Sequence, residues 1–403
     1  MRIGMIMDTS FPPDARVENE AITLMENGYE VVLFHIDYEG KPERDEHHGI
    51  QIFRVYAGPL LYKLSALVYT IPVFTRIVKT KIDHFINEYK PDMLHIHDMV
   101  IAESVFQANQ KYQLPVVLDL HENRPEIMKL YKHVNQWPGN WLINLKKWKE
   151  KQREFMEKAD HVILVTEEAR IAANISNRIP LDKITAVPNV VRFDRFDTHA
   201  ESNEVRKFTE GKFTMLYIGD TSLRRGTLSV LKAVNRIRDL VPELQMVFVG
   251  SSSQDEQLNK YVNQNGLNNV VSFEGWQDPE RLPAYINASE LCLSPLLRNP
   301  HHDTTYANKL FQYMAAGKPV IASDCPAQKA VIEQAKCGLI YKAGSPDDLA
   351  EKILELYKNP EKRKIMGRNG EAAVRKHWNW DVTGVELLKA YKATISSSGL
   401  KEL

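Results

Sequence analysis

The stretch that most constrains the fold of this chain is residues 303–324, DTTYANKLFQYMAAGKPVIASD. From residue 305 to 316 the apolar residues recur with the period of a helix, so one face is apolar and the other carries hydrogen-bonding side chains. Gly317 ends this predicted helix, and residues 319–322 have the composition of a short strand buried on both faces. A helix that leads directly into a buried strand is half of a parallel α/β unit. Open parallel sheets bind ligands at the carboxyl ends of their strands.

Strand-like and helix-like segments alternate along the whole chain, and no internal repeat interrupts them. This alternation predicts an α/β fold with two Rossmann-like, doubly wound domains that face each other across a cleft. We expect an N-terminal domain at residues 1–190, a polar linker at 191–211 and a C-terminal domain at 212–378. The predicted strands are residues 3–7, 29–36, 50–55, 93–96, 116–120, 161–165, 184–187, 213–218, 245–249, 270–273, 291–294, 319–322 and 339–341.

Composition excludes several classes of protein. The chain has 403 residues with 52 Lys and Arg against 52 Asp and Glu, and this zero net charge argues against a nucleic-acid binder. The three cysteines, Cys292, Cys325 and Cys337, form no CxxC pair, so neither a disulfide framework nor a zinc site is expected. No apolar run reaches the roughly 20 residues that a membrane-spanning helix needs. We therefore expect a cytoplasmic protein.

Residues 309–323, KLFQYMAAGKPVIAS, resemble the donor-site helix of the retaining group 1 (GT4-like) glycosyltransferases, which have the two-domain GT-B fold. Residues 308–315 match, position by position, a subgroup with the pattern Asn/Ser-Lys-x-Phe-Glu/Gln-Tyr-Met-Ala. Most members carry Glu where this chain has Thr304 and Gln312. The resemblance also implies that a C-terminal helix, about residues 380–395, returns to the first domain.

The resemblance implies a function as well. It predicts a hexosyltransferase-like enzyme that moves a sugar, with retention, from a nucleotide diphospho-sugar to a saccharide or lipid-linked saccharide acceptor. The pathway would be surface polysaccharide or glycoconjugate assembly. A UDP-sugar is the first choice of co-substrate, and no other cofactor is expected. The chain has no Asp-x-Asp motif, so we also expect catalysis without a metal ion.

The loop at residues 219–226, GDTSLRRG, lies between a predicted strand and a predicted helix. A helix N-terminus and basic side chains stabilise the negative charge of a departing diphosphate. Arg225 takes the family's terminal basic position, whereas Asp220 stands where relatives have Arg, a departure for which Arg224 or Lys309 would compensate. The predicted donor-binding residues are Gly219, Arg224, Arg225, Ser251, Trp276, Asn308, Lys309, Leu310 and Gln312.

Polar residues also follow the predicted strands of the first domain. His121 comes directly after residues 116–120, and by resemblance it is the catalytic residue that meets the donor sugar or the charge at its anomeric carbon. Asp14 is placed either to cap a helix or to bind acceptor. Arg16, in the first helical turn, opposes the helix dipole unless it meets an anion or an acceptor. The predicted acceptor-binding residues are Asp14, Arg16, His97, Asp98 and Glu122.

Two segments of the first domain are candidates for membrane contact. Residues 60–82 combine apolar and aromatic residues with four basic residues and no acid, and residues 129–153 hold three tryptophans and seven basic residues against one acid. Such mixtures are typical of segments that bind the surface of an anionic membrane, here the inner face of the cytoplasmic membrane. The alternative interpretation is an ordinary solvated helix with aromatic core contacts.

Two other functions fit parts of the pattern. A non-hydrolysing nucleotide-sugar epimerase would share the architecture, but it needs carboxylates near the donor, where this chain has Thr304 and Gln312. A catalytically weak subunit that binds sugar or membrane for a partner is the second alternative, because Asp220 departs from the family pattern.

Overall fold

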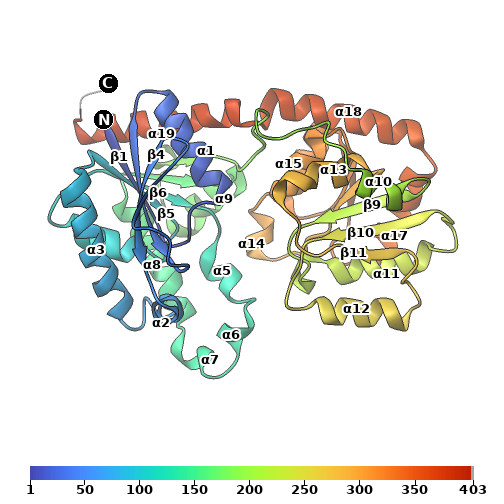
Figure 1. The fold of residues 1–403 in the computed structure, drawn as a ribbon, viewed down its shortest axis with the longest axis horizontal. Coiled ribbons are helices and arrows are strands. Elements are labelled where there is room, and N and C mark those ends of the chain that lie inside the picture. Colours follow the sequence, from blue (N-terminus) through green and yellow to red (C-terminus); the bar gives the residue numbers. More distant parts are fainter. Residues whose placement is uncertain (401–403) are drawn as a thin grey trace. The chain divides into compact units, whose positions relative to one another are not determined.

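The computed structural model describes residues 1–400 and divides the chain into two compact units. The first unit is Met1–Pro188 together with the C-terminal segment from Thr383, and the second is Asn189–Val382. Each unit is built on a sheet of parallel or mainly parallel strands, with helices packed against it (Figure 1). The C-terminal segment therefore belongs to the first unit, as the sequence predicted.

The first sheet has the strand order β3-β4-β2-β1-β5-β6-β7-β8. All neighbours pair in parallel except β3 and β4, which are antiparallel. The strands are β1 (Arg2–Met7), β2 (Glu30–Asp37), β3 (Arg44–His47), β4 (Ile50–Tyr56), β5 (Met93–His97), β6 (Val116–Leu120), β7 (His161–Leu164) and β8 (Ile184–Ala186).

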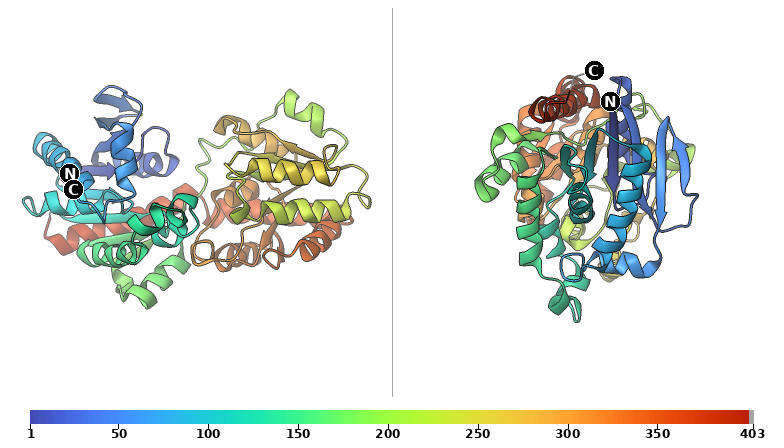
Figure 2. Two further views of the ribbon diagram at one scale, coloured as in Figure 1. Left: turned by 90° about the horizontal axis from the view of Figure 1, so that it is seen from below. Right: turned by 90° about the vertical axis from the view of Figure 1, so that its left-hand side faces the viewer.

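Eleven helical segments belong wholly or mostly to the first unit as described. Figure 2 shows the last of them, α19, in red beside the blue N-terminal elements, and the Tyr391 ring of α19 contacts the Tyr29 ring at 5.8 Å between centroids. The segments are α1 (Ala15–Glu26), α2 (Pro59–Ser65), α3 (Val73–Tyr89), α4 (Ala102–Asn109), α5 (Arg124–Met128), α6 (Lys132–Asn135), α7 (Gly139–Leu142), α8 (Leu145–Lys158), α9 (Glu167–Asn177), η1 (Leu181–Lys183) and α19 (Trp380–Ser398).

The second sheet is parallel throughout, in the order β11-β10-β9-β12-β13-β14. Its strands are β9 (Phe213–Ile218), β10 (Leu244–Val249), β11 (Val271–Phe273), β12 (Leu291–Ser294), β13 (Val320–Ser323) and β14 (Gly338–Tyr341). In Figure 1, α11 and α12 lie on one side of this sheet and α15 on the other. The helical segments are α10 (Asn203–Thr209), η2 (Leu223–Arg225), α11 (Thr227–Ile237), α12 (Asp255–Gln264), η3 (Pro279–Arg281), α13 (Leu282–Asn287), α14 (Pro300–Asp303), α15 (Asn308–Ala315), α16 (Pro326–Ala335), α17 (Pro346–Tyr357) and α18 (Pro360–His377).

Each unit has its own hydrophobic core, as the two alternating patterns predicted. One cluster gathers Phe34, Phe85 and Trp148 with other buried residues of the first unit. The other gathers Tyr217, Phe248 and their neighbours in the second unit. The central strands β1, β9 and β12 are buried on both faces, because helices cover both sides of a doubly wound sheet.

Four local features differ from the sequence analysis. The edge strand β3 was not predicted, because its sequence RDEH has no apolar residue. Helix α15 begins at Asn308 rather than at residue 305. The predicted linker 191–211 contains α10 and is part of the second unit. The C-terminal helix was predicted to end at about residue 395, but α19 continues to Ser398, and the hydroxyls of Ser397 and Ser398 donate to helix carbonyls.

Among residues 1–400, no helix combines the length and the apolar character that crossing a bilayer requires.

Candidate functional site

Three glycine turns lie together at the carboxyl ends of β9, β10 and β11. The N–H of Gly219 donates to Val249 O, and the N–H of Gly250 donates to Gly275 O, both at 2.7 Å. All three glycines have positive φ, and a Cβ on Gly250 would lie 2.2 Å from Gly219 O. Only glycine allows the turns to approach this closely, so this edge presents bare backbone to a ligand.

The loop after β9 is held by Asp220. Its carboxylate accepts hydrogen bonds from the N–H and the hydroxyl of Ser222, at 2.9 and 3.0 Å, and from Arg224 at 2.6 Å. Burial opposes ionisation of Asp220, but these hydrogen bonds and the charges of Arg224 and Arg225 outweigh it and lower the pKa of the carboxyl. Asp220 therefore stabilises the loop and partly neutralises Arg224, the residue expected to compensate for it.

Arg225 and Lys309 are the two cations least committed to protein partners in this loop region. Arg225 Nε lies 3.6 Å from Asp220, and Lys309 Nζ makes no ion pair or hydrogen bond within the part of the chain that the structure describes. Instead, the Lys309 ammonium lies over the Tyr217 ring, 3.6 Å from its centroid, and beside Gly219. Burial, followed by repulsion from Arg225, holds the pKa of Lys309 well below its usual value, against the attraction of Asp220.

The first turn of α15 places Lys309 at this edge. Tyr313, one turn later, accepts a hydrogen bond from the N–H of Ile218 at 2.8 Å, which fixes α15 against the end of β9. Leu310 is fully buried, and its N–H donates to Ala307 O. Neither the side chain nor the N–H of Leu310 is therefore available for the contact with a donor sugar nucleotide that the sequence analysis predicted. Gln312 is half-buried, and Asn308 is exposed.

Ser251 and Trp276 follow β10 and β11 at the same edge. Both side chains are exposed, Trp276 to 72%. Trp276 is therefore not part of the hydrophobic core.

Two buried histidines near the basic loop were missed in the sequence analysis. His301 and His302 form α14 together with Pro300 and Asp303. Burial and the nearby arginines Arg225 and Arg224 lower the pKa of His301 to about 4 and of His302 to about 3. His301 Nδ1 and His302 Nε2 are buried without a partner. The only available signal was the His-His pair directly before the donor helix.

The other candidate residues lie at the carboxyl edge of the first sheet. His97 ends β5, Asp98 follows it, and His121 comes directly after β6. His97 Nδ1 lies 3.2 Å from His121 Nε2. A carboxylate oxygen of Asp119 lies 3.0 Å from the same nitrogen of His121. The structure thus gathers the three predicted residues His97, Asp98 and His121 into one cluster.

Asp14, Arg16 and Glu122 have protein partners. Asp14 caps α1, because its carboxylate accepts from the N–H groups of Arg16 and Val17. Arg16 was expected to meet an acceptor, but its guanidinium is 3% exposed and pairs with Asp119 and Glu20. Glu122 pairs with Arg124 at 2.6 Å and keeps a partly exposed side chain.

Among residues 1–400, two groups of side chains have the donor atoms of a metal site. Glu20, His95, His97 and Asp119 are all buried, and Glu18, His47 and His48 are partly exposed. In the first group, the Arg16 guanidinium lies on both carboxylates, at 2.8 and 3.1 Å, so a divalent cation would be repelled. In the second group, both imidazoles already hydrogen-bond to Glu18.

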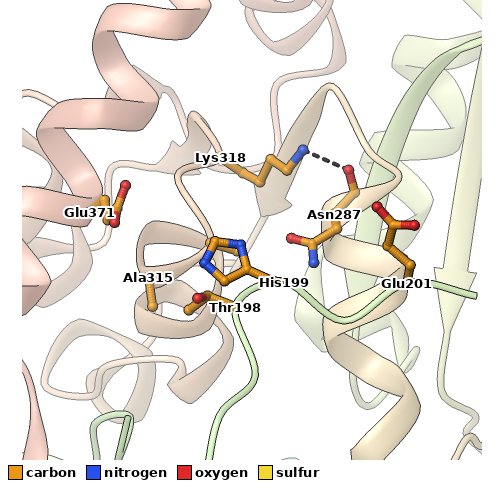
Figure 3. Close-up of a pocket in the computed structure, with 8 residues that line it drawn as sticks. Thr198, His199, Glu201, Asn287, Ala315, Lys318 and Glu371 are labelled. Atoms are coloured by element: carbon orange, nitrogen blue, oxygen red, sulfur yellow. Dashed lines mark hydrogen bonds between the residues drawn. The ribbon is translucent and has the colours of Figure 1, made fainter.

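A separate cavity of about 300 Å³ lies in the second unit near the C-terminal end of α15 (Figure 3). Lys318 is in its wall, but the Lys318 ammonium donates to the carbonyls of Asn287 and Ser289, both at 2.8 Å. None of the predicted donor-binding residues lines this cavity. It is lined by Thr198, His199, Glu201, Asn287, Ala315, Ala316, Lys318 and Glu371.

Comparison with known proteins assigns both halves of the chain to glycosyltransferase families. Residues 15–195 match Glycosyltransferase Family 4, and residues 199–373 match Glycosyl transferases group 1. An uncharacterized glycosyltransferase of Methanocaldococcus jannaschii is 24% identical over 60% of each chain. A phosphatidyl-myo-inositol mannosyltransferase of Mycobacterium leprae is 24% identical over 100% of this chain and 99% of its own.

Solved structures share the fold. Sucrose-phosphate synthase from Thermosynechococcus elongatus superposes with a TM-score of 0.78 at 18% identity, covering 98% of this chain and 99% of its own. Anabaena HepE, solved with UDP-glucose, superposes with a TM-score of 0.73 at 15% identity, covering 98% and 100%. The prediction of a GT-B fold with two Rossmann-like units is confirmed.

Proposed function

Because the chain is a glycosyltransferase of the group 1, GT4-like family, we propose that its second unit binds a nucleotide diphospho-sugar through Arg225 and Lys309. The turns at Gly219, Gly250 and Gly275 form what we call the glycine edge. The observation that carries this proposal is the Lys309 ammonium, which lies at the glycine edge and has no acidic partner among the described residues. Placing a cation in a half-buried position costs free energy, and an anionic ligand would repay that cost. A diphosphate brings the charge that Arg225 and Lys309 together would neutralise.

The close approach of the three glycine turns supports the same ligand. These turns present backbone without side chains, and the start of α11 at Thr227 offers the N-terminus of a helix, which would stabilise phosphate oxygens. We propose that the exposed residues Ser251, Trp276 and Asn308, together with the half-buried Gln312, contact the sugar or the nucleoside from the same edge. A UDP-sugar is the first candidate, and HepE is a structural neighbour that was solved with UDP-glucose.

We propose a saccharide or lipid-linked saccharide as acceptor, bound at the edge of the first unit that carries Asp98, His121 and Glu122. These three side chains are partly exposed, to 24%, 20% and 22%, so they are accessible to hydroxyl groups. The Mycobacterium leprae relative is named for transfer to a phosphatidylinositol lipid, which favours a lipid-linked acceptor for this chain as well. The relatives are named as glycosyltransferases, and this favours sugar transfer over epimerisation.

A membrane surface would bring the enzyme to a lipid-linked acceptor, and we propose that the α6–α7 region binds it. Trp137 and Trp141 are 84% and 82% exposed, whereas Trp148 is buried in the core. The hydroxyl of Thr70 donates to Leu142 O at 2.9 Å, so the two segments noted in the sequence lie side by side. Exposed tryptophan with basic side chains such as Lys146 is typical of an interfacial segment.

The proposal is tested by measuring the melting temperature of the protein with UDP, GDP, UDP-glucose and GDP-mannose. A donor that binds the folded state raises the melting temperature by mass action. We expect at least one nucleotide to do so, and we expect Lys309→Ala to reduce the shift at the same nucleotide concentration. Lys260→Ala, an exposed lysine of the same unit, is the matched control. If none of the four ligands shifted the wild type, the proposed donor site would be wrong.

Transfer itself is tested with the stabilising donor and a panel of saccharide and lipid-linked acceptors. NMR of the product would report the configuration at the anomeric carbon, which we expect to be retained. A reaction of the donor alone that gives its epimer would support the epimerase alternative instead. Donor binding without turnover on any acceptor would support the weak partner subunit.

A further inference from the structure

A buried polar network surrounds His121 in the first unit. Arg16 and Glu20 lie one turn apart on α1, and His95 and His97 are alternate residues of β5. Asp119 lies on β6 opposite His97, and His121 follows it by two residues, so both project to the same face of the sheet. The Tyr391 hydroxyl of α19 lies 2.6 Å from His95 Nδ1 and closes the network on the far side.

Arg16 fixes the carboxylate of Asp119. Its Nε and one terminal nitrogen bond the two oxygens of Asp119, at 2.9 and 2.8 Å, and its other terminal nitrogen donates to Val187 O at 2.8 Å. This fork-to-fork geometry is the strongest form of a charged hydrogen bond and holds the carboxylate in one orientation. Asp119 is fully buried, so it has no water to turn toward.

His121 lies between two carboxylates. Its Nε2 is 3.0 Å from Asp119, and its Nδ1 is 3.6 Å from Asp98. The main-chain N–H of His121 donates to the other oxygen of Asp98 at 3.1 Å. Asp98 has φ of 63°, a strained conformation for a residue with a side chain, and this places its carboxylate against His121.

The charges around the ring favour the imidazolium form. Burial lowers the pKa of His121, but Asp98 and Asp119 overcome that effect and raise it to about 10, against a smaller opposing effect of Arg16. His97 and His95 are neutral neighbours, because burial lowers the pKa of both. The ionisable groups that face His121 are Asp8, Arg16, Glu20, His95, His97, Asp98 and Asp119.

We propose that Asp119, locked by Arg16, and Asp98 together keep His121 protonated throughout the reaction, so that His121 is a fixed cation and not a general base. Arg16 and Asp119 are then positioning residues for His121. Nε2–H is bonded to Asp119, whereas Nδ1 is beyond hydrogen-bond distance of Asp98 and has its proton available for a substrate oxygen. This role of His121 rests on the proposed function, because it assumes that the substrates of sugar transfer meet the imidazolium.

The assignment fixes where the protons go. In sugar transfer, the bond between the anomeric carbon and the phosphate oxygen breaks, and a bond to the acceptor oxygen forms. The acceptor hydroxyl proton must leave, and His121, already protonated, cannot accept it. The proton passes to an oxygen of the departing diphosphate, while the positive charge of His121 stabilises negative charge on substrate oxygens.

The direct test is an NMR titration of the full chain labelled with ¹⁵N-histidine, with the His121 resonances assigned through His121→Gln. We expect the wild-type imidazole to stay charged at pH 8. We expect Asp119→Asn and Asp98→Asn each to lower its pKa by at least one unit. Asp160→Asn, which removes a carboxylate at the opposite end of β6, is the control and should leave the titration of His121 unchanged. A wild-type His121 that is neutral at pH 7.5 would overturn the proposal.

Activity gives a second readout that a purely structural role would not change. A fixed cation predicts a rate of transfer that is constant from pH 6 to 8 and falls on the alkaline side, and Asp119→Asn should move that fall to lower pH. A general base predicts the opposite, namely loss of rate on acidification. Arg16→Lys keeps the charge but loses the paired hydrogen bonds, so we expect an intermediate shift in the pH profile.

The two proposals fail separately. Donor binding is measured on the second unit's residues, and the titration of His121 needs no donor. A neutral His121 in a protein that binds donor would refute the fixed cation and leave the proposed function standing. A charged His121 in a protein that binds none of the nucleotides would refute the proposed function alone. If Asp119→Asn does not fold, the wild-type and Asp98→Asn titrations still decide the question.

Discussion

Lys309 Nζ lies 3.6 Å from the centroid of the Tyr217 ring, and this stacking is the ammonium's main contact with the protein. A cation over an aromatic face is stabilised, but by less than an ion pair in the same place. The ammonium is therefore poised for a stronger anionic partner. The relationship joins β9, where Tyr217 lies, to the first turn of α15.

We expect Lys309→Ala to weaken the binding of a nucleoside diphosphate by roughly 10- to 100-fold, the equivalent of one charged hydrogen bond. Isothermal titration with UDP and GDP measures this directly. Tyr217→Leu should weaken binding less, because it removes the support of the ammonium but not its charge. Unchanged affinity in Lys309→Ala, with Lys260→Ala also unchanged, would exclude Lys309 from the site.

The affinity for the nucleotide should also depend on pH. The pKa of Lys309 is lowered in the free protein, so the fraction of charged lysine falls as pH rises through that lowered value. Only the charged form attracts a diphosphate, so affinity should decline on the alkaline side earlier than for an ordinary lysine. Binding should be accompanied by proton uptake, which titrations in buffers of different ionisation enthalpy would reveal. A pH-independent affinity up to pH 9 would contradict this.

We expect Asp220→Asn to increase the affinity for a diphosphate. The amide keeps the loop's hydrogen bond with the N–H of Ser222 but removes a negative charge 2.6 Å from Arg224 and 3.6 Å from Arg225. Both arginines would then be available to phosphate oxygens, and titration with UDP should show an affinity several-fold higher. Weaker binding would mean that the ion pair between Asp220 and Arg224 is needed to shape the loop.

The candidate donor site could be predicted from local sequence signals, whereas the partners of other candidate residues depended on packing. The motif at residues 308–315 predicted Lys309 as a donor-binding residue, and the strand–loop–helix pattern predicted Arg225. Both stay predictions until donor binding is measured. The partners of Arg16 could not be read from the sequence, since Asp119 is 103 residues away and the two meet only in the folded sheet. The start of α15 was misplaced because the Thr305 hydroxyl bonds back to His301 O, an alternative to helix that periodicity cannot detect.

Acid should destabilise the protein through His301 and His302. Their pKa values are lowered in the folded state to about 4 and about 3, from an ordinary value of 6.5. As pH falls below 6.5, the unfolded chain binds protons that the folded chain excludes, so the free energy of unfolding decreases toward pH 4. We expect His301→Gln to reduce the slope of the urea midpoint against pH over this range. His199→Gln, at an exposed position, is the matched control, and equal slopes in wild type and His301→Gln would refute the assignment.

Vesicle binding should depend on the two exposed tryptophans of the α6–α7 region. We expect wild-type protein to sediment with vesicles rich in phosphatidylglycerol and not with neutral ones, since tryptophan and lysine act together at an anionic surface. Trp137→Ser with Trp141→Ser should reduce the bound fraction at least several-fold. Trp276→Ser removes another exposed tryptophan, at 72%, from the other unit and should have no such effect. Equal binding by both variants would rule out this region.

Gly250 and Gly275 provide a matched pair for the glycine edge. Both have positive φ, at 127° and 66°, so alanine strains the backbone at either position. At Gly250 the added Cβ would also lie 2.2 Å from Gly219 O, whereas at Gly275 it would meet no heavy atom within 4 Å. We therefore expect Gly275→Ala to cost about 1–2 kcal/mol of unfolding free energy and to keep nucleotide binding. Gly250→Ala should cost more and displace the Gly219 turn, so binding should be lost even where the variant folds.

Urea unfolding measures the loss of stability in each variant, and titration with UDP measures the loss of binding. Equal losses in the two variants would show that the close approach of Gly219 and Gly250 has no part in the site.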